Sequence, residues 1–217
     1  MLLVCIGKAT KLADTLQAHE KEYLAGVVFG ATTPSYDREK EIDRHWPLEG
    51  VSEAALEAVL PSFLGEQEQV APLFSAKSVD GVRAYEMARK AYKAALKGDG
   101  AFDHSASELL SRQRICISEM ELMAYGSVDL CDSRSAGIEG RVNPKINVIS
   151  LDTLDLPCAL IRVACTKGTY IRALARDLGE ALGSGAFLGS LRRTRTGGFR
   201  VEEALSLTDT LSALEPA

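Results

Sequence analysis

The stretch CTKGTYIRALARDLGEALG, residues 165–183, decides the fold, because it joins the end of an apolar segment to an amphipathic helix. Four of its apolar residues recur at spacings of three or four: Ile171, Leu174, Leu178 and Leu182. That spacing predicts a helix that packs one stripe on a sheet. Gly183 suits the left-handed position that ends a helix, and Thr169 is expected to cap the helix start.

Arg172 stands in the first turn of this expected helix and lies off the apolar stripe. A cation there opposes the helix dipole at a cost of about 0.3–1 kcal/mol. Arg172 is therefore either an exposed residue without a role or a residue that faces an anion, a carboxylate or a phosphate. Tyr170 beside it could belong to the core, stack on a base, or hold a catalytic group through its hydroxyl.

The composition is that of an ordinary globular protein, with 217 residues, 46% hydrophobic and 25% charged. The five cysteines are odd in number and scattered, so we expect reduced thiols in the cytoplasm rather than a disulfide framework or a zinc site. No segment approaches the ~20 apolar residues of a membrane span. No glycine-rich nucleotide-binding motif occurs, so a nucleotide cofactor has no support.

The net charge of −5 conceals an asymmetry along the chain. Residues 161–200 contain eight basic and two acidic side chains, a charge of +6 that leaves −11 on the rest. A basic patch on an acidic body can bind a polyanion locally, whereas a solvated basic face is the alternative reading.

Helical and strand-like patterns interleave along the chain without a regular repeat. We expect helices over about residues 10–21, 52–65, 82–96 and 207–214, and strands over about 23–29, 114–126, 158–168 and 185–205. Alternation predicts that Leu191, Arg193 and Arg195 share one side of the last strand. Residues 97–113 and 131–147 are polar and turn-rich and are expected to be surface excursions. The fold class is mixed α/β or α+β around one sheet.

Four blocks in register resemble the TruB-type bacterial tRNA pseudouridine synthases, which modify the T loop. They cover residues 5–37, 63–89, 165–186 and 191–199, and include the run KGTYIR–DLG–LG–GA–LRR. The resemblance implies a central mixed, largely antiparallel sheet flanked by helices. It also implies a single catalytic-type domain over residues 1–217, without a C-terminal PUA domain.

The resemblance implies an isomerase that converts uridine to pseudouridine in the T arm of tRNA. The family detaches uracil from its ribose, rotates it and rejoins it through carbon, which needs neither cofactor nor metal. A flipped-out base is needed, and a loop base is less costly to flip than a duplex base. We expect a cytoplasmic monomer that binds tRNA and no membrane.

The resemblance also assigns candidate site residues. It implies that Tyr23 stacks on the target uracil and can help to remove a proton, that Arg172 bridges to the catalytic aspartate, and that Tyr170 shapes the same pocket. The remaining candidates are expected to bind substrate: Lys167, Leu191, Arg192 and Arg193.

The sequence departs from the family at the catalytic aspartate itself. The family carries it in a Gly-x-Leu-Asp-Pro-x-Ala-Thr-Gly loop just before the segment that matches Met1 onward. We therefore expect an N-terminally truncated chain that lacks its N-terminal strands and forms no pseudouridine alone. The alternatives are a catalytically silent protein that binds RNA or helps tRNA fold, and a plain scaffold with a basic face. Asp37, in the turn after the Tyr23 strand, is expected to be structural or RNA-facing.

Overall fold

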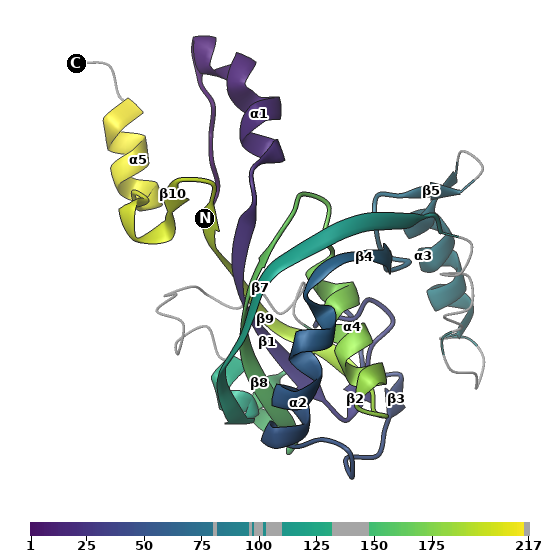
Figure 1. Ribbon diagram of the computed structural model, residues 1–217. Helices are drawn as coiled ribbons and strands as arrows, with labels where there is room; N and C mark the ends of the chain where they lie inside the picture. The colour runs from purple at the N-terminus through teal and green to yellow at the C-terminus, as the bar shows by residue number, and fades with distance from the viewer. Residues whose placement is uncertain (80–81, 96, 98–101, 103–109, 132–147, 215–217) are drawn as a thin grey trace.

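The computed structural model describes residues 1–79, 82–95, 97, 102, 110–131 and 148–214 (Figure 1). The two expected surface excursions, 97–113 and 131–147, lie largely outside these residues. The described chain forms one six-stranded sheet with helices packed against it, together with two short hairpins. The mixed α/β fold class expected from the sequence is confirmed.

The sheet has the strand order β10-β9-β1-β8-β7-β4, and every neighbouring pair is antiparallel. Its strands are β1 (Lys21–Phe29), β4 (Gly65–Val70), β7 (Arg112–Ser127), β8 (Pro157–Cys165), β9 (Ala186–Thr196) and β10 (Phe199–Arg200). The hairpins pair β2 (Ala31–Thr32) with β3 (Arg44–His45) and β5 (Ser78–Val79) with β6 (Val82–Arg83).

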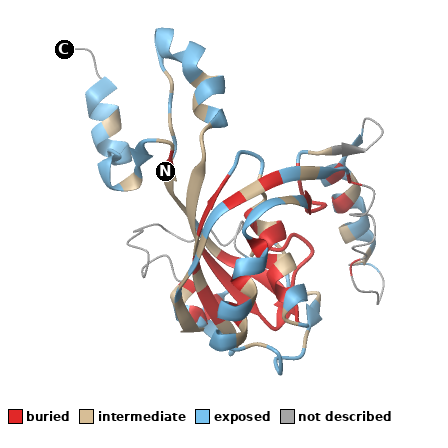
Figure 2. Cartoon of the chain, viewed as in Figure 1, coloured by how far each residue is buried: buried red, intermediate tan, exposed pale blue. Residues whose placement is uncertain are grey.

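Five α-helices accompany the sheet in the described part of the chain: α1 (Ala13–Ala18), α2 (Glu53–Val59), α3 (Ala84–Ala95), α4 (Ile171–Ala181) and α5 (Leu207–Leu214). The expected helix over 10–21 is shorter, because Gly7–Leu12 forms a 3₁₀ helix and strand β1 already begins at Lys21. Ser52 caps α2 by accepting a hydrogen bond from the Ala55 amide. In Figure 1, α1 and α5 project beyond the sheet, and Figure 2 shows both largely exposed.

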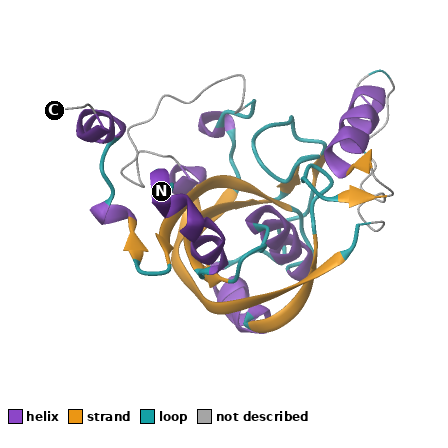
Figure 3. Ribbon diagram, turned by 90° about the horizontal axis from the view of Figure 1, so that it is seen from above, coloured by secondary structure: helices purple, strands orange, loops and turns teal. Residues whose placement is uncertain are grey.

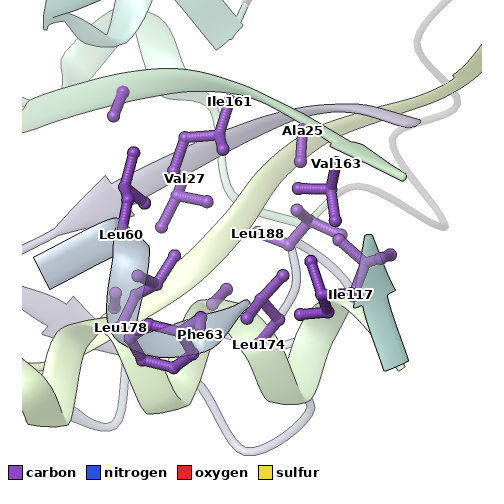
Figure 4. Close-up of a cluster of buried hydrophobic side chains, with 14 of the residues drawn as sticks. Ala25, Val27, Leu60, Phe63, Ile117, Ile161, Val163, Leu174, Leu178 and Leu188 are labelled. Carbon is purple, nitrogen blue, oxygen red and sulfur yellow. The ribbon is translucent and has the colours of Figure 1, made fainter. Parts of the chain in front are cut away.

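The main core lies between one face of the sheet and helices α2 and α4. The predicted stripe of α4 is confirmed, since Ile171, Leu174 and Leu178 are buried and Leu182 packs at the margin. Figure 3 shows the long strands curving round the helices. Figure 4 shows Leu174 and Leu178 pointing from α4 toward the sheet. The sheet thus fixes the position of α4, whose first turn carries Arg172.

A second buried cluster lies on the opposite face and contains a disulfide between Cys131 and Cys158. Both cysteines are fully buried, and they close the 3₁₀ helix Val128–Cys131 against strand β8. The expectation of reduced thiols is therefore wrong for this pair, while Cys5, Cys116 and Cys165 are free. Scattered spacing could not reveal the pair, because the sulfurs meet only after β7 and β8 have paired.

Strand β9 contains a bulge that simple alternation does not predict. Glu22 pairs with Arg195 and Tyr23 with Arg193, so Thr194 is the extra residue. Because successive residues of β1 point to opposite faces, Arg195 lies on the face of Glu22 and not on that of Tyr23. The expectation that Leu191, Arg193 and Arg195 share one side is wrong for Arg195.

Leu178→Ala should destabilise the protein by about 2–5 kcal/mol, because the leucine side chain is fully buried between α4 and the sheet. Leu211→Ala is the matched control, since Leu211 on α5 is 57% exposed and should change stability by no more than about 0.5 kcal/mol. Urea unfolding measures both. Equal losses for the two variants would contradict this packing.

Thiol titration of the denatured protein tests the disulfide. Without reductant, three thiols should react, those of Cys5, Cys116 and Cys165, and full reduction should raise the count to five. Cys131→Ser should release the Cys158 thiol and give four without reduction. Five reactive thiols before reduction would show that the pair is open.

Candidate active site

The turn between β8 and α4 delivers the candidate site residues to the start of the helix. Gly168 has a φ of +94°, a left-handed conformation that strains any residue with a Cβ and therefore favours glycine. Thr169 does not cap α4, contrary to expectation, because its hydroxyl donates to the Thr166 carbonyl at 3.0 Å. Tyr170 occupies the N-cap position without a side-chain cap.

Arg172 faces an anion, as one of the two readings of the sequence required. Its Nη1 lies 2.9 Å from Oδ2 of Asp37, and its Nη2 donates to the Phe74 carbonyl at 2.9 Å. Nη1 also donates to the Ser35 carbonyl at 3.3 Å. The side chains are only 25% and 17% exposed, so the pair is partly desolvated. The sequence analysis singled out Asp37, but it did not pair Asp37 with Arg172, which is 135 residues away in the chain.

Asp37 is fixed by hydrogen bonds from its own loop and by the Arg172 guanidinium. Its Oδ1 accepts from the Ser35 hydroxyl at 2.6 Å and from the Glu39 amide at 2.9 Å, while Oδ2 pairs with Arg172. The Thr33 hydroxyl donates to the backbone carbonyl of Asp37 at 2.8 Å. Both carboxylate oxygens are therefore occupied. Such a carboxylate orients the guanidinium well, because three donors fix its own direction.

The residue before Asp37 adopts an unusual backbone conformation. Tyr36 has a φ of +55°, which for a residue other than glycine costs of order 1–3 kcal/mol and persists only where surroundings enforce it. Its amide donates to the Thr33 carbonyl at 3.0 Å, and its carbonyl accepts from Leu188 at 3.0 Å. The Arg176 guanidinium lies 5.7 Å from its ring centroid. This strained turn presents Asp37 to α4.

Tyr23, Leu191 and Arg193 share the sheet face on which α4 packs. In the β1–β9 register Tyr23 pairs with Arg193, and Leu191 pairs with Ala25 of the main core. The Arg193 guanidinium lies 5.7 Å from the Tyr23 ring centroid. Burial raises the pKa of the Tyr23 phenol, which keeps it protonated at neutral pH. Leu191 remains 45% exposed, so it is available to a ligand.

The other three candidates lie in different surroundings. Lys167 is exposed in the turn before α4. Arg192 pairs with Leu24, which points to the face opposite Tyr23, so the register does not bring it to this group. Tyr170 packs beside a small cluster around Phe74, with its ring partly buried.

Half of the basic side chains in the positive segment are neutralised locally. Arg162 forms ion pairs with Glu22, Glu119 and Glu121, at 3.3, 2.7 and 2.6 Å. Arg195 pairs with Glu20 at 2.8 Å. Arg172 and Arg176 have their own partners in Asp37 and Asp177. On the sheet face opposite Tyr23, Arg162 and Arg195 therefore form ion pairs with glutamates instead of the basic patch that the composition indicated.

Comparison with known families decides the family to which this fold belongs. Residues 1–102 match the model described as "TruB family pseudouridylate synthase (N terminal domain)". Residues 172–216 match the model described as "tRNA pseudouridylate synthase B C-terminal domain". The chain is 41% identical to tRNA pseudouridine synthase B of Phocaeicola vulgatus, over 95% of the chain and 70% of that protein. The chain belongs to the TruB family.

Other TruB-family proteins agree with this assignment. The chain is 42% identical to tRNA pseudouridine synthase B of Bacteroides thetaiotaomicron, over 94% of the chain and 69% of that protein. The Thermus thermophilus protein of the same name is 39% identical over 96% of the chain and 64% of that protein. Tyr23 and Asp37 lie within the range of this chain that matches the first model, and Arg172, Leu191 and Arg193 lie within the range that matches the second.

A solved structure shares the TruB-family fold. A chain in the crystal structure of a Cbf5-Nop10-Gar1 complex superposes with a TM-score of 0.53 over 95% of this chain and 40% of that one, at 24% identity. At that identity the likeness concerns the fold alone. In the part of the chain that the structure describes, no three His, Cys, Asp or Glu side chains gather as a metal site would require. None of the described helices has the length and apolar character to cross a membrane.

A double-mutant cycle of Asp37→Asn and Arg172→Gln should reveal a coupling energy of about 1 kcal/mol or more, because the two side chains are in contact and partly buried. Each single variant leaves the other side chain of the pair charged but without its counter-ion. The double variant removes both charges and so leaves no unpaired charge. Urea unfolding of the four proteins gives the coupling. Additive effects, within about 0.3–0.5 kcal/mol, would contradict the ion pair.

Proposed function

We propose that this protein serves the conversion of uridine to pseudouridine in the T loop of tRNA, acting as a monomer. The observation that carries the proposal is the Arg172–Asp37 pair at the start of α4, on the sheet face that also bears Tyr23 and Leu191. The family membership of the chain supplies the reaction class. A tRNA substrate favours the cytoplasm as the place of reaction.

The reaction needs a site that holds one base rigidly while its bonds change. The bond from the ribose carbon to the uracil nitrogen breaks, the base rotates, and a bond forms from the ribose to a ring carbon. That ring carbon loses its proton, and the released ring nitrogen gains one. Substrate and product are isomers, so the protein has only to bind, orient and stabilise. Tyr23 suits stacking on the uracil, and the half-exposed Leu191 suits a pocket wall.

Tyr23 acts in this proposal as a stacking and hydrogen-bonding group rather than as a base. Burial raises its pKa, so the phenolate that would accept a proton is scarce at neutral pH. The nearby Arg193 opposes that shift but does not outweigh burial. The protonated hydroxyl can instead donate a hydrogen bond to a uracil carbonyl.

Asp37 is a positioning group in this proposal, and not the carboxylate that attacks or stabilises the intermediate. Both of its oxygens already accept hydrogen bonds from Ser35, Glu39 and Arg172. Among the described residues, Asp37 is the one carboxylate that pairs with Arg172. The family resemblance assigns the attacking aspartate to a Leu-Asp-Pro loop, a motif that does not occur in these 217 residues.

The T arm is the proposed target because its loop base costs less to extrude than a duplex base. Lys167 is exposed beside the start of α4 and forms no ion pair with any described residue, so it is available to a phosphate. Arg193 adds a second positive charge, on the sheet face that bears Tyr23. Affinity should therefore fall as salt rises.

The proposal is tested with two proteins: the 217-residue chain, and a fusion that places the family's Gly-x-Leu-Asp-Pro-x-Ala-Thr-Gly loop before Met1. Both should bind a T-arm stem-loop. Only the fusion should form pseudouridine, because only it contains the aspartate of the Leu-Asp-Pro loop. Filter binding measures affinity, and mass spectrometry of the digested RNA measures pseudouridine.

The control is the same fusion with its loop aspartate replaced by asparagine, which should bind RNA and form no product. Absence of T-arm binding by both proteins would overturn the proposed function. Pseudouridine formed by the 217-residue chain alone would overturn the role given to Asp37.

A second candidate function is a silent RNA-binding protein of the same fold, which helps tRNA to fold. The occupied oxygens of Asp37 favour it, because they leave a binding surface without a described nucleophile. Under this alternative the fusion would bind the T arm but remain inactive.

A further inference from the structure

Gln69, the fifth residue of strand β4, makes contacts that neither the site nor the core explains. Its side chain is only 3% exposed. The amide nitrogen Nε2 donates to the Tyr170 carbonyl at 3.2 Å, and the Tyr170 amide donates to Oε1 at 2.8 Å. One side chain therefore pairs with both backbone groups of a residue 101 positions away.

The paired residue is the one from which α4 begins. Tyr170 is the N-cap of α4 and has no side-chain cap of its own. Its carbonyl also accepts the first helical hydrogen bond, from the Leu174 amide at 3.0 Å. Gln69 thus fixes the backbone of Tyr170 from outside the helix, two residues before Arg172.

The chain that follows Gln69 continues along the same helix. The Val70 carbonyl accepts from Arg176 at 3.2 Å, and the Phe74 carbonyl accepts from Arg172 at 2.9 Å. The segment 69–74 therefore holds both α4 arginines by its carbonyl groups, while Gln69 holds the backbone that carries them. These contacts combine with Asp37 to restrict the guanidinium of Arg172 to one direction.

We propose that Gln69 is a positioning residue that aims Arg172 at Asp37 and the uracil site. The inference rests on the proposed function of that site. Only glutamine combines a donor and an acceptor at this reach, since glutamate loses the donor, methionine loses both, and asparagine is one methylene shorter. Gln69 does not touch the substrate, and it acts through the first turn of α4.

The alternative is that Gln69 only satisfies a buried helix end. The two roles differ in what happens to Arg172, whose guanidinium should respond only if Gln69 aims it. The side-chain Nε–Hε cross-peak of Arg172 in an NMR spectrum, assigned by its absence in Arg172→Lys, reports that group directly. Amide hydrogen exchange at Tyr170 reports the helix end.

The test compares Gln69→Met with Gln67→Met. Gln67 is two residues earlier on β4, so it points to the same face of the strand, but its amide donates to the Phe63 carbonyl and not to α4. Gln69→Met should speed exchange of the Tyr170 amide at least about tenfold, which would correspond to about 1.4 kcal/mol of lost protection. It should also shift the Arg172 cross-peak and weaken T-arm binding, whereas Gln67→Met should leave all three readouts unchanged.

An unchanged Arg172 cross-peak in Gln69→Met would overturn the proposal, even if Tyr170 exchange rises. Should Gln69→Met fail to fold, Gln69→Asn keeps the buried amide but cannot reach Tyr170, and the same cross-peak decides. Failure of the unaltered chain to bind T-arm RNA would overturn the proposed function alone, because the NMR comparison needs no RNA.

Discussion

The organisation of the site depends on one ion pair, between Arg172 in the first turn of α4 and Asp37 in the loop after β2. An arginine at that position opposes the helix dipole, and a fixed negative partner offsets this cost. Asp37 supplies one at 2.9 Å, held by the strained turn at Tyr36. The pair joins two segments distant in sequence and brings a directed guanidinium to the sheet face that carries Tyr23.

The two faces of the sheet carry different features of the molecule. One face buries the stripe of α4 and also bears Tyr23 and Leu191. The other face buries the Cys131–Cys158 disulfide and, beyond it, ties Arg162 and Arg195 to glutamates. Composition alone would assign Arg162 and Arg195 to RNA binding, but both form ion pairs within the sheet instead.

Local sequence patterns predicted the helices and strands. Features that depend on contacts between distant residues could not be predicted from them. The stripe of α4 followed from spacing along a few residues. The residue that caps α4 could not be predicted from local spacing, because Tyr170 is held by the side chain of Gln69, 101 residues earlier. The partner of Arg172 likewise depended on a contact across 135 residues. The bulge in β9 inverted Arg195, which alternation cannot foresee.

The central claim is that uracil binds on the α4 face of the sheet, between Tyr23 and the guanidinium that Asp37 holds. A crystal structure of this chain with a T-arm stem-loop RNA would test it most directly. We expect the extruded base to lie against the Tyr23 ring, with Arg172 still paired to Asp37. RNA bound across the opposite face, along Arg162 and Arg192, would contradict the account.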